Sequence, residues 1–285
     1  MMGFLWRRTP PPPVTPAAVT LREVSVGAVL AGISAVIQPG ACVGVIGVNG
    51  AGKSTLLATM AGVIRPDSGH IEGTAQAAYL PEGFAVDPAI TVRRWLSLAA
   101  HLPGWNPDVG GAIAADMALP PRVTVARLSQ GQRLRLGLIL TLGRDAPCYL
   151  LDDPFLGLDP VGRTHAERWI ARRSEDATVI LAAQDAEAVD RLCTDLLLLD
   201  GGEVLGWGAI EEWRARFVAV RLTGADEAIA AVSGRVLHHR TRGSHHDLIL
   251  DDADGQVRAL LAAAGGRVVP APLRLDELIA ALVTR

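Results

Sequence analysis

The sequence is short of lysine: Lys53 is the only lysine among the 27 lysine and arginine residues of a 285-residue chain. Cysteine is scarce too, and because Cys42, Cys148 and Cys193 all lie in apolar segments, we expect buried reduced thiols and no disulfide framework. No stretch reaches 18 uncharged apolar residues, which argues against a membrane-spanning helix. A net charge of −3 gives no general attraction for nucleic acid, so we expect no nucleic-acid partner.

Composition divides the chain into four parts. Residues 1–18 hold four successive prolines, Pro10 to Pro13, where a secretion signal would have an apolar segment, so we predict a disordered arm and a cytoplasmic location. Residues 19–208 alternate strand-like runs with amphipathic helices, which is typical of an α/β domain with a largely parallel sheet. Within them, residues 83–127 are rich in Gly, Pro and Trp and indicate a helical insertion.

The fourth part, residues 209–285, has a separate pattern of strands and helices. Its order, β-α-β-β-α-β, predicts a small ferredoxin-like α+β accessory domain, closed by a last helix over residues 276–283. Two histidine pairs flank a predicted hairpin turn and place His239 roughly opposite His246, which fits either a metal site or two solvated strand faces. The predicted strands cover residues 218–222, 235–240, 245–250 and 267–269, the helices cover residues 226–232 and 256–264, and the histidines are His238, His239, His245 and His246.

The only lysine lies in a segment that fits the pattern G-x-x-x-x-G-K-S/T at every position. Residues 41–46 predict a buried strand before it and residues 54–61 a helix after it. Strand, loop and helix collect backbone N–H groups around one anion, and an ammonium adds a compact positive charge between two phosphates. We therefore predict a nucleotide site, with Ser54 on Mg²⁺. It comprises Gly47, Val48, Asn49, Gly50, Ala51, Gly52, Lys53, Ser54 and Thr55.

A second polar motif, Ser129-Gln130-Gly131-Gln132, precedes another predicted helix. By itself the pattern S-x-x-Q equally describes a capping box. A serine hydroxyl, a glycine amide and a helix N-terminus also suit a second anion site. Asp152 follows later, at the end of an apolar strand.

This succession resembles that of ATP-binding cassette (ABC) proteins, whose LSGGQ signature here has Gln130 in place of the first glycine. Three further segments resemble family motifs in the same order. Tyr79–Glu82 is similar to the Q-loop, Gly157–Pro160 to the D-loop and Leu181–Asp185 to the H-loop. The resemblance implies a P-loop NTPase (RecA-like) core with an ABC-type helical insertion.

Three features further resemble those of the ATPase subunits of ABC-2 type transporters. They are Glu82 and the segments Gly104–Pro107 and Leu273–Leu278. The resemblance covers roughly residues 19–285. It implies a chain that is peripheral on the cytoplasmic face of the membrane through a separately encoded ABC-2 permease. It also implies a second ABC ATPase domain, in a homodimer or a heterodimer, with ATP held between the two.

The resemblance assigns roles to single residues. Lys53 would hold the β- and γ-phosphates of ATP, and Ser54, Asp152 and Glu82 would hold Mg²⁺. The signature would act in trans, completing the ATP site of the partner domain. Its residues are Ser129, Gln130, Gly131 and Gln132.

Two departures from the family fall on the hydrolytic step. Asp153 stands where the family has a glutamate that activates water, and Gln184 where it has a histidine that contacts the γ-phosphate. Aspartate is shorter by about 1.5 Å, the length of one C–C bond, and glutamine carries no positive charge. We expect ATP hydrolysis coupled to transport, at a low rate. A degenerate regulatory subunit of a heteromeric complex and a soluble, non-transport ABC ATPase are the alternatives.

A third departure concerns the base of ATP. Family members commonly stack adenine on an aromatic residue before the P-loop, but residues 24–30 hold no aromatic side chain. We expect modest ATP affinity and adenine selectivity, unless Trp6 or another aromatic residue supplies the platform.

Overall fold

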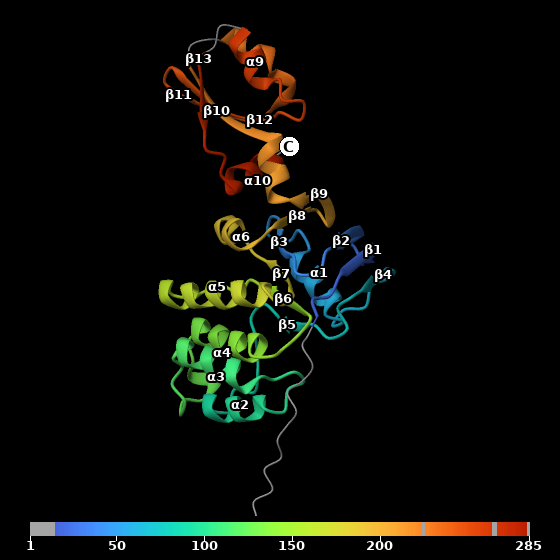
Figure 1. Ribbon diagram of the computed structural model, residues 1–285, viewed down its shortest axis with the longest axis vertical. Coiled ribbons are helices and arrows are strands. Elements are labelled where there is room, and N and C mark those ends of the chain that lie inside the picture. The colour runs from blue at the N-terminus through green and yellow to red at the C-terminus, as the bar shows by residue number, and fades with distance from the viewer. Residues whose placement is uncertain (1–14, 224–225, 264–266, 284–285) are drawn as a thin grey trace, which may run out of the picture.

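The fold is organised around a six-stranded sheet with the strand order β5-β6-β7-β3-β8-β9 (Figure 1). Neighbouring strands from β5 to β8 pair in parallel, and β9 pairs antiparallel to β8. Every residue of the three central strands β6, β7 and β3 is buried, because a parallel sheet is covered on both faces. The prediction of a largely parallel α/β sheet is confirmed. The strands are β5 (Ala78–Leu80), β6 (Cys148–Asp152), β7 (Thr178–Ala182), β3 (Cys42–Ile46), β8 (Asp195–Asp200) and β9 (Glu203–Ala209).

The computed structural model describes residues 15–223, 226–263 and 267–283. Most of the predicted proline-rich arm, residues 1–14, lies outside them, and so does Trp6. At the start of the described chain, the amide of Ala17 donates to the carbonyl of Pro147, and the Thr178 hydroxyl donates to the carbonyl of Ala17. None of the described helices is long and apolar enough to cross a membrane.

Helix α1 (Lys53–Met60) and a small antiparallel sheet cover one face of the central sheet. The small sheet has the order β2-β1-β4, with β1 (Val19–Val26), β2 (Leu30–Ile37) and β4 (Ser68–Glu72). Val43 and Val45 of β3 pack in this layer with Leu56 and Leu57 of α1. Strand β3 and helix α1 follow the predicted strand and helix around the lysine motif closely.

Three helices cover the opposite face: α4 (Gln130–Leu142), α5 (Pro160–Ser174) and α6 (Ala186–Leu192). The two faces of each strand are separated by the alternation of side chains, since Leu196 and Leu198 of β8 lie on this face while Leu197 and Leu199 lie on the other. Each central strand therefore contributes apolar side chains to both layers and has no polar face. This accounts for the continuous apolar runs in the sequence.

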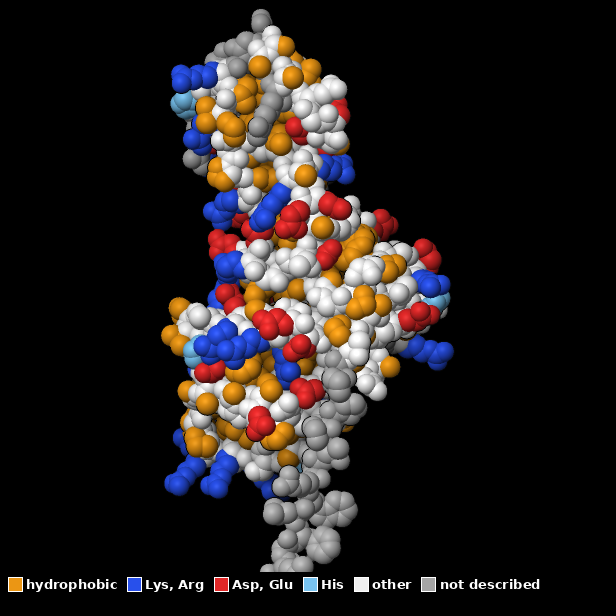
Figure 2. Space-filling model, viewed as in Figure 1, with side chains coloured by type: hydrophobic (Ala, Val, Ile, Leu, Met, Phe, Trp, Pro, Cys, Tyr) orange, Lys and Arg blue, Asp and Glu red, His pale blue; other side chains and the backbone are white. Residues whose placement is uncertain are grey.

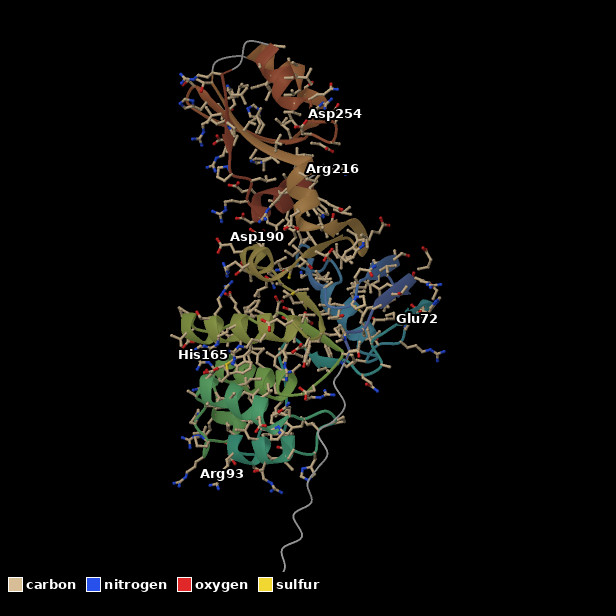
Figure 3. The ribbon with its side chains drawn as sticks, in the orientation of Figure 1. Glu72, Arg93, His165, Asp190, Arg216 and Asp254 are labelled. Atoms are coloured by element: carbon tan, nitrogen blue, oxygen red, sulfur yellow. The ribbon has the colours of Figure 1, made fainter. Side chains whose placement is uncertain are left out.

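The predicted insertion is helical and is fixed against α5. It contains α2 (Val92–Ala99), α3 (Pro107–Met117) and the short 3₁₀ helix η1 (Val125–Arg127). Asp116 near the end of α3 accepts hydrogen bonds from the Trp169 indole, at 2.7 Å, and from Arg168. His165, labelled in Figure 3, contacts the backbone carbonyl of the same aspartate. Three side chains of α5 thus meet at one residue of the insertion.

The carboxy-terminal part follows helix α7 (Ile210–Arg216) and has a four-stranded antiparallel sheet with the order β11-β12-β10-β13. Its elements occur in the β-α-β-β-α-β order that the sequence predicts: β10 (Phe217–Thr223), α8 (Asp226–Ala231), the 3₁₀ helix η2 (Ser233–Arg235), β11 (Val236–Arg242), β12 (His245–Asp251), α9 (Val257–Ala263) and β13 (Arg267–Ala271). Helices α8 and α9 pack on one face of the sheet. Helix α10 (Leu275–Val283) lies at the other face and also contacts α6 (Figure 1).

Close packing of β3 against α6 yields a stability prediction. A Cβ atom on Gly44 would lie 2.3 Å from Cγ1 of Val189, so Gly44→Ala overfills the contact. We expect it to lower the free energy of unfolding by about 1–3 kcal/mol, measured by urea denaturation. Adding Val189→Ala should recover part of that loss, because it removes the colliding methyl groups.

The control is Gly111→Ala, in α3, where a Cβ atom would meet nothing within 4 Å. That variant should unfold no more easily than the wild type, since alanine is the better helix former. Strictly additive effects of Gly44→Ala and Val189→Ala would contradict the proposed collision.

Candidate active site

The lysine motif forms a tight loop between β3 and α1. Gly47 has no room for a side chain, because a Cβ atom there would lie 2.1 Å from the carbonyl oxygen of Leu199. Gly52, directly before α1, has a φ of 102°, a left-handed conformation that favours glycine. The Lys53 ammonium donates to the carbonyls of Gly47 (2.9 Å) and Val48 (3.1 Å), so the loop curls around it. A positive charge and the N-terminus of α1 meet at the same point.

Two oxygen-bearing side chains lie beside this loop. The Ser54 hydroxyl, in the first turn of α1, donates to Oδ1 of Asp152 at 3.1 Å. Asp152 ends β6 and is only 1% exposed. Burial raises the pKa of its carboxyl, the Ser54 hydrogen bond opposes that rise, and nearby Asp153 adds to it. A buried carboxylate that is paired with a hydroxyl, and with no cationic side chain among the described residues, fits a site for a hard divalent ion such as Mg²⁺.

Asp153 and Gln184, the two departures from the family motifs, face each other. The Gln184 backbone amide and side-chain Nε2 donate to the two carboxylate oxygens of Asp153, at 3.3 and 3.4 Å. Asp153 has a φ of 45°, in the left-handed region, and its amide donates to the carbonyl of Ala182. The Asp153 carboxylate is therefore held by Gln184 at the end of the neighbouring strand, β7. A substitution of either residue alters the environment of the other.

Glu82 lies close to the same cluster. It lines a pocket of about 450 Å³ together with Phe84, Gln130 and Asp153. Burial, with the nearby charges of Asp152 and Glu82, raises the pKa of the Tyr79 hydroxyl to about 12. The structure thus brings Lys53, Ser54, Asp152, Asp153, Gln184 and Glu82 to one end of the central sheet.

The second motif is a capping box at the start of α4, as its pattern allows. The Ser129 hydroxyl accepts from the Gln132 amide at 3.2 Å, and the Gln132 side chain accepts from the Ser129 amide at 3.0 Å. Gly131 packs so tightly that a Cβ atom would lie 2.3 Å from the carbonyl oxygen of Gly157. Among the described residues no hydrogen bond joins this motif to the lysine loop.

The turn before the lysine loop carries aliphatic side chains. Val29 is 43% exposed, and its carbonyl would lie 3.1 Å from a Cβ atom on Gly52. Ala31 donates to the carbonyl of Gly202, which ties the start of β2 to the β8–β9 turn. The turn therefore touches the loop without offering an aromatic surface for a base.

A tryptophan of the insertion and the histidines of the accessory domain have local explanations. Trp95 is partly buried beside Val92 and Leu136, and its indole donates to the carbonyl of Asp87, so it belongs to the core of the insertion. The register pairs Thr241 with His246, so His239, which the sequence predicts to lie roughly opposite His246, is offset from it by two residues along the strand. Their rings nevertheless touch diagonally, with Nε2 of His239 2.9 Å from Nδ1 of His246. The described residues contain no group of three or more potential metal ligands.

Comparisons with known proteins place the chain in a family. The family described as ABC transporter matches residues 30–156. The cobalamin import ATP-binding protein BtuD of Halobacterium salinarum is 32% identical, over 86% of this chain and 70% of its own length. The chain belongs to the ABC transporter family. It is an ATP-binding subunit that hydrolyses ATP.

Two further relatives and one solved structure are similar to this ABC subunit. The Nod factor export ATP-binding protein I of Burkholderia thailandensis is 28% identical over 90% of this chain and 92% of its length. The daunorubicin resistance ATP-binding protein DrrA3 of Streptomyces coeruleorubidus is 33% identical over 65% of each chain. A solved structure, an ATP-binding subunit of an ABC transporter, has the same fold, with a TM-score of 0.64 and 24% identity over 70% of this chain and 92% of its own.

The buried carboxyl of Asp152 allows a prediction with a definite sign. Its pKa is higher in the folded chain than the ordinary 3.8, so the stability it contributes falls as the pH rises above that value. Near neutral pH, Asp152→Asn removes the cost of the buried charge. We expect the apo ABC subunit to melt at a higher temperature, by roughly 2–4 °C for each kcal/mol regained.

If Asp152 holds Mg²⁺, the same substitution should also abolish the stabilisation that Mg²⁺ and ATP give to the wild type. Differential scanning fluorimetry with and without Mg²⁺-ATP measures both effects. Asp108→Asn, at an exposed position in the first turn of α3, should leave the Mg²⁺-ATP shift unchanged and should not raise the apo melting temperature, because a carboxylate is favourable at a helix N-terminus. A lower apo melting temperature with an intact Mg²⁺-ATP shift would contradict the assignment of Asp152.

Proposed function

We propose that this chain is the ATPase subunit of an ABC-2 type transporter, which drives a separately encoded membrane permease from its cytoplasmic face. The observation that carries the proposal is the convergence of Lys53, Ser54, Asp152 and the Asp153–Gln184 pair at one sheet end. Glu82 supports the ABC-2 branch, as do relatives named for Nod factor export and daunorubicin resistance.

The residues of the site divide the work of binding and hydrolysis. Lys53 and the loop amides hold the phosphates of ATP, and Ser54, Asp152 and Glu82 hold Mg²⁺. When bound, Mg²⁺ neutralises phosphate charge. Asp153 orients the attacking water and accepts its proton. Gln184 faces the γ-phosphate and, through its amide, holds the Asp153 carboxylate in place.

A second ATPase domain completes each site. The motif Ser129 to Gln132 makes no hydrogen bond to the lysine loop among the described residues, but its capping box presents the N-terminus of α4. This arrangement suits a phosphate bound by a facing domain. We infer a head-to-tail dimer in which this signature contacts ATP on the partner, with either the same or a different ATPase chain.

The permease docks on the helical insertion. Arg93, labelled in Figure 3, lies in the part of the insertion that points away from the carboxy-terminal sheet. Arg93, Arg94 and Leu102 are exposed there, and the described residues offer no ion pair to either arginine. Residues 209–285 form the accessory domain, which we assign to the ferredoxin-like class because its strand order, β11-β12-β10-β13, fits that class.

The docking site can be tested with a photoreactive amino acid at Leu102 in the insertion, 36% exposed. In membranes of the native cell we expect a crosslink from residue 102 to an integral membrane protein, identified by mass spectrometry. The matched position is Val269 in β13, 49% exposed, which should give no such crosslink. Membrane-protein crosslinks from residue 269 alone would move the docking surface to the accessory domain.

The Asp153–Gln184 pair yields the kinetic prediction. A shorter base and an uncharged contact both weaken the hydrolytic step, and general base catalysis typically contributes about 10²–10⁴-fold in rate. We expect Asp153→Glu combined with Gln184→His to raise ATP turnover at least about tenfold, a barrier change of roughly 1.4 kcal/mol. Phosphate release at saturating Mg²⁺-ATP measures it, with Lys53→Ala as the inactive control.

A double variant no faster than the wild type, with folding and ATP binding intact, would mean that aspartate and glutamine are adapted to this site. A fast wild-type enzyme would have the same meaning.

A further inference from the structure

A groove opens on the face of the carboxy-terminal sheet opposite α8 and α9. Strand β10 alternates between the faces, since Val220 and Leu222 pack under α8 and α9 while Ala219 and Arg221 point to the other side. Helix α10 covers only part of that side, where Leu278 and Ala281 meet Phe217 and Ile249. The uncovered part, which we call the α10 groove, has a volume of about 410 Å³.

The floor of the α10 groove is apolar. Ala219 and Ile249 line it from the middle strands, Ala271 and Pro272 from the end of β13, and Ala280 from α10. Most of these side chains are small, which leaves the space open. A volume of this size is in the range of small-molecule sites, which are mostly apolar with a few placed polar groups.

The rim of the groove is mainly cationic. Arg221 is held by Asp247, at 2.6 and 3.2 Å, so this pair is already satisfied. Arg240 lies opposite Asp247 on the adjacent strand, yet it forms no ion pair with any described residue. His238 and Arg274 add two further nitrogen-bearing side chains, and Glu277 a carboxylate. Figure 2 shows arginine and histidine side chains gathered along the β11 side of this domain.

The state of Arg240 contrasts with that of other arginines in the domain. Arg216 is paired with Asp251, and Arg235 with Asp254. Their carboxylate partners lie at the end of β12 and in the turn that follows it. Arg240 instead offers its donors at the edge of an apolar groove, where a carboxylate or phosphate accepts two of them at once.

We propose that the α10 groove binds a small amphipathic anion, an aliphatic chain that ends in a carboxylate or a phosphate. The chain lies on Ala219, Ile249 and Ala271, and the head group is held by Arg240 and Arg274. This inference goes beyond the proposed function and does not depend on it, because no residue of the ATP site takes part.

Arg274 connects the groove to the body of the ABC subunit. Its guanidinium is shared between Asp276, at 3.0 Å, and Glu187 of α6, at 3.2 Å. A bound anion competes with Glu187 for the same donors. Removing the Glu187 carboxylate therefore makes Arg274 more available, and the anion should bind more tightly although Glu187 does not line the groove.

Isothermal titration of the full chain with sodium octanoate tests the proposal. We expect saturable binding of one octanoate per chain. Arg240→Ala should weaken it about tenfold or more, as is typical for the loss of a charge-assisted hydrogen bond. Arg267→Ala, at an exposed position of β13 outside the groove, should leave it unchanged. Glu187→Gln should tighten it roughly two- to fivefold, the range for an exposed ion pair.

Octylamine and inorganic phosphate separate the two parts of the ligand. Octylamine has the chain with the opposite charge and should not bind, and phosphate has the charge without the chain and should bind at least about tenfold more weakly. Four results would each overturn the proposal. They are octylamine binding as tightly as octanoate, phosphate binding as tightly as octanoate, an octanoate affinity unaffected by Arg240→Ala, and no saturable octanoate binding. Circular dichroism of each variant confirms that the accessory domain is folded.

Discussion

The candidate active site depends on the parallel pairing of three neighbouring strands. Because β3, β6 and β7 run in the same direction, their carboxyl ends meet at one edge of the sheet. The lysine loop follows β3, Asp152 ends β6 with Asp153 directly after it, and Gln184 follows β7. The pairing of Asp152 with Ala182 sets the height of these groups relative to one another. A shift of one residue in that register would separate Asp153 from Gln184.

Much of this arrangement could be predicted from the sequence, because apolar runs and a complete lysine motif report local structure directly. The strand before Lys53, the helix after it and the capping box at Ser129 all follow from residues close together in the chain. The contact between Asp153 and Gln184 could not, since it depends on strand register. The sequence placed His239 near His246, but the two-residue offset between them could not be predicted for the same reason. The packing of α10 on α6 needed the tertiary fold.

The preference for arginine also shapes how the chain is held together. A guanidinium reaches several acceptors in one plane, which an ammonium does not. Arg173 donates to the carbonyls of Leu142 and Arg144 and to the carboxylate of Asp145, so one side chain satisfies three groups at the end of α4. Only the nucleotide loop keeps an ammonium, which fits between two of its own carbonyls. Side-chain chemistry thus separates scaffold cations from the one in the site.

The anchoring of the insertion at Asp116 has a mechanical consequence. Helix α5 holds this residue through His165, Arg168 and Trp169, and the same helix begins at Asp159, whose carboxylate pairs with Arg135 of α4. A force on the insertion would therefore be transmitted through Asp116 to α5, and through Asp159 to Arg135 of α4. Movement of the insertion relative to α4 and α5 would therefore have to break the contacts of Asp116 with His165, Arg168 and Trp169.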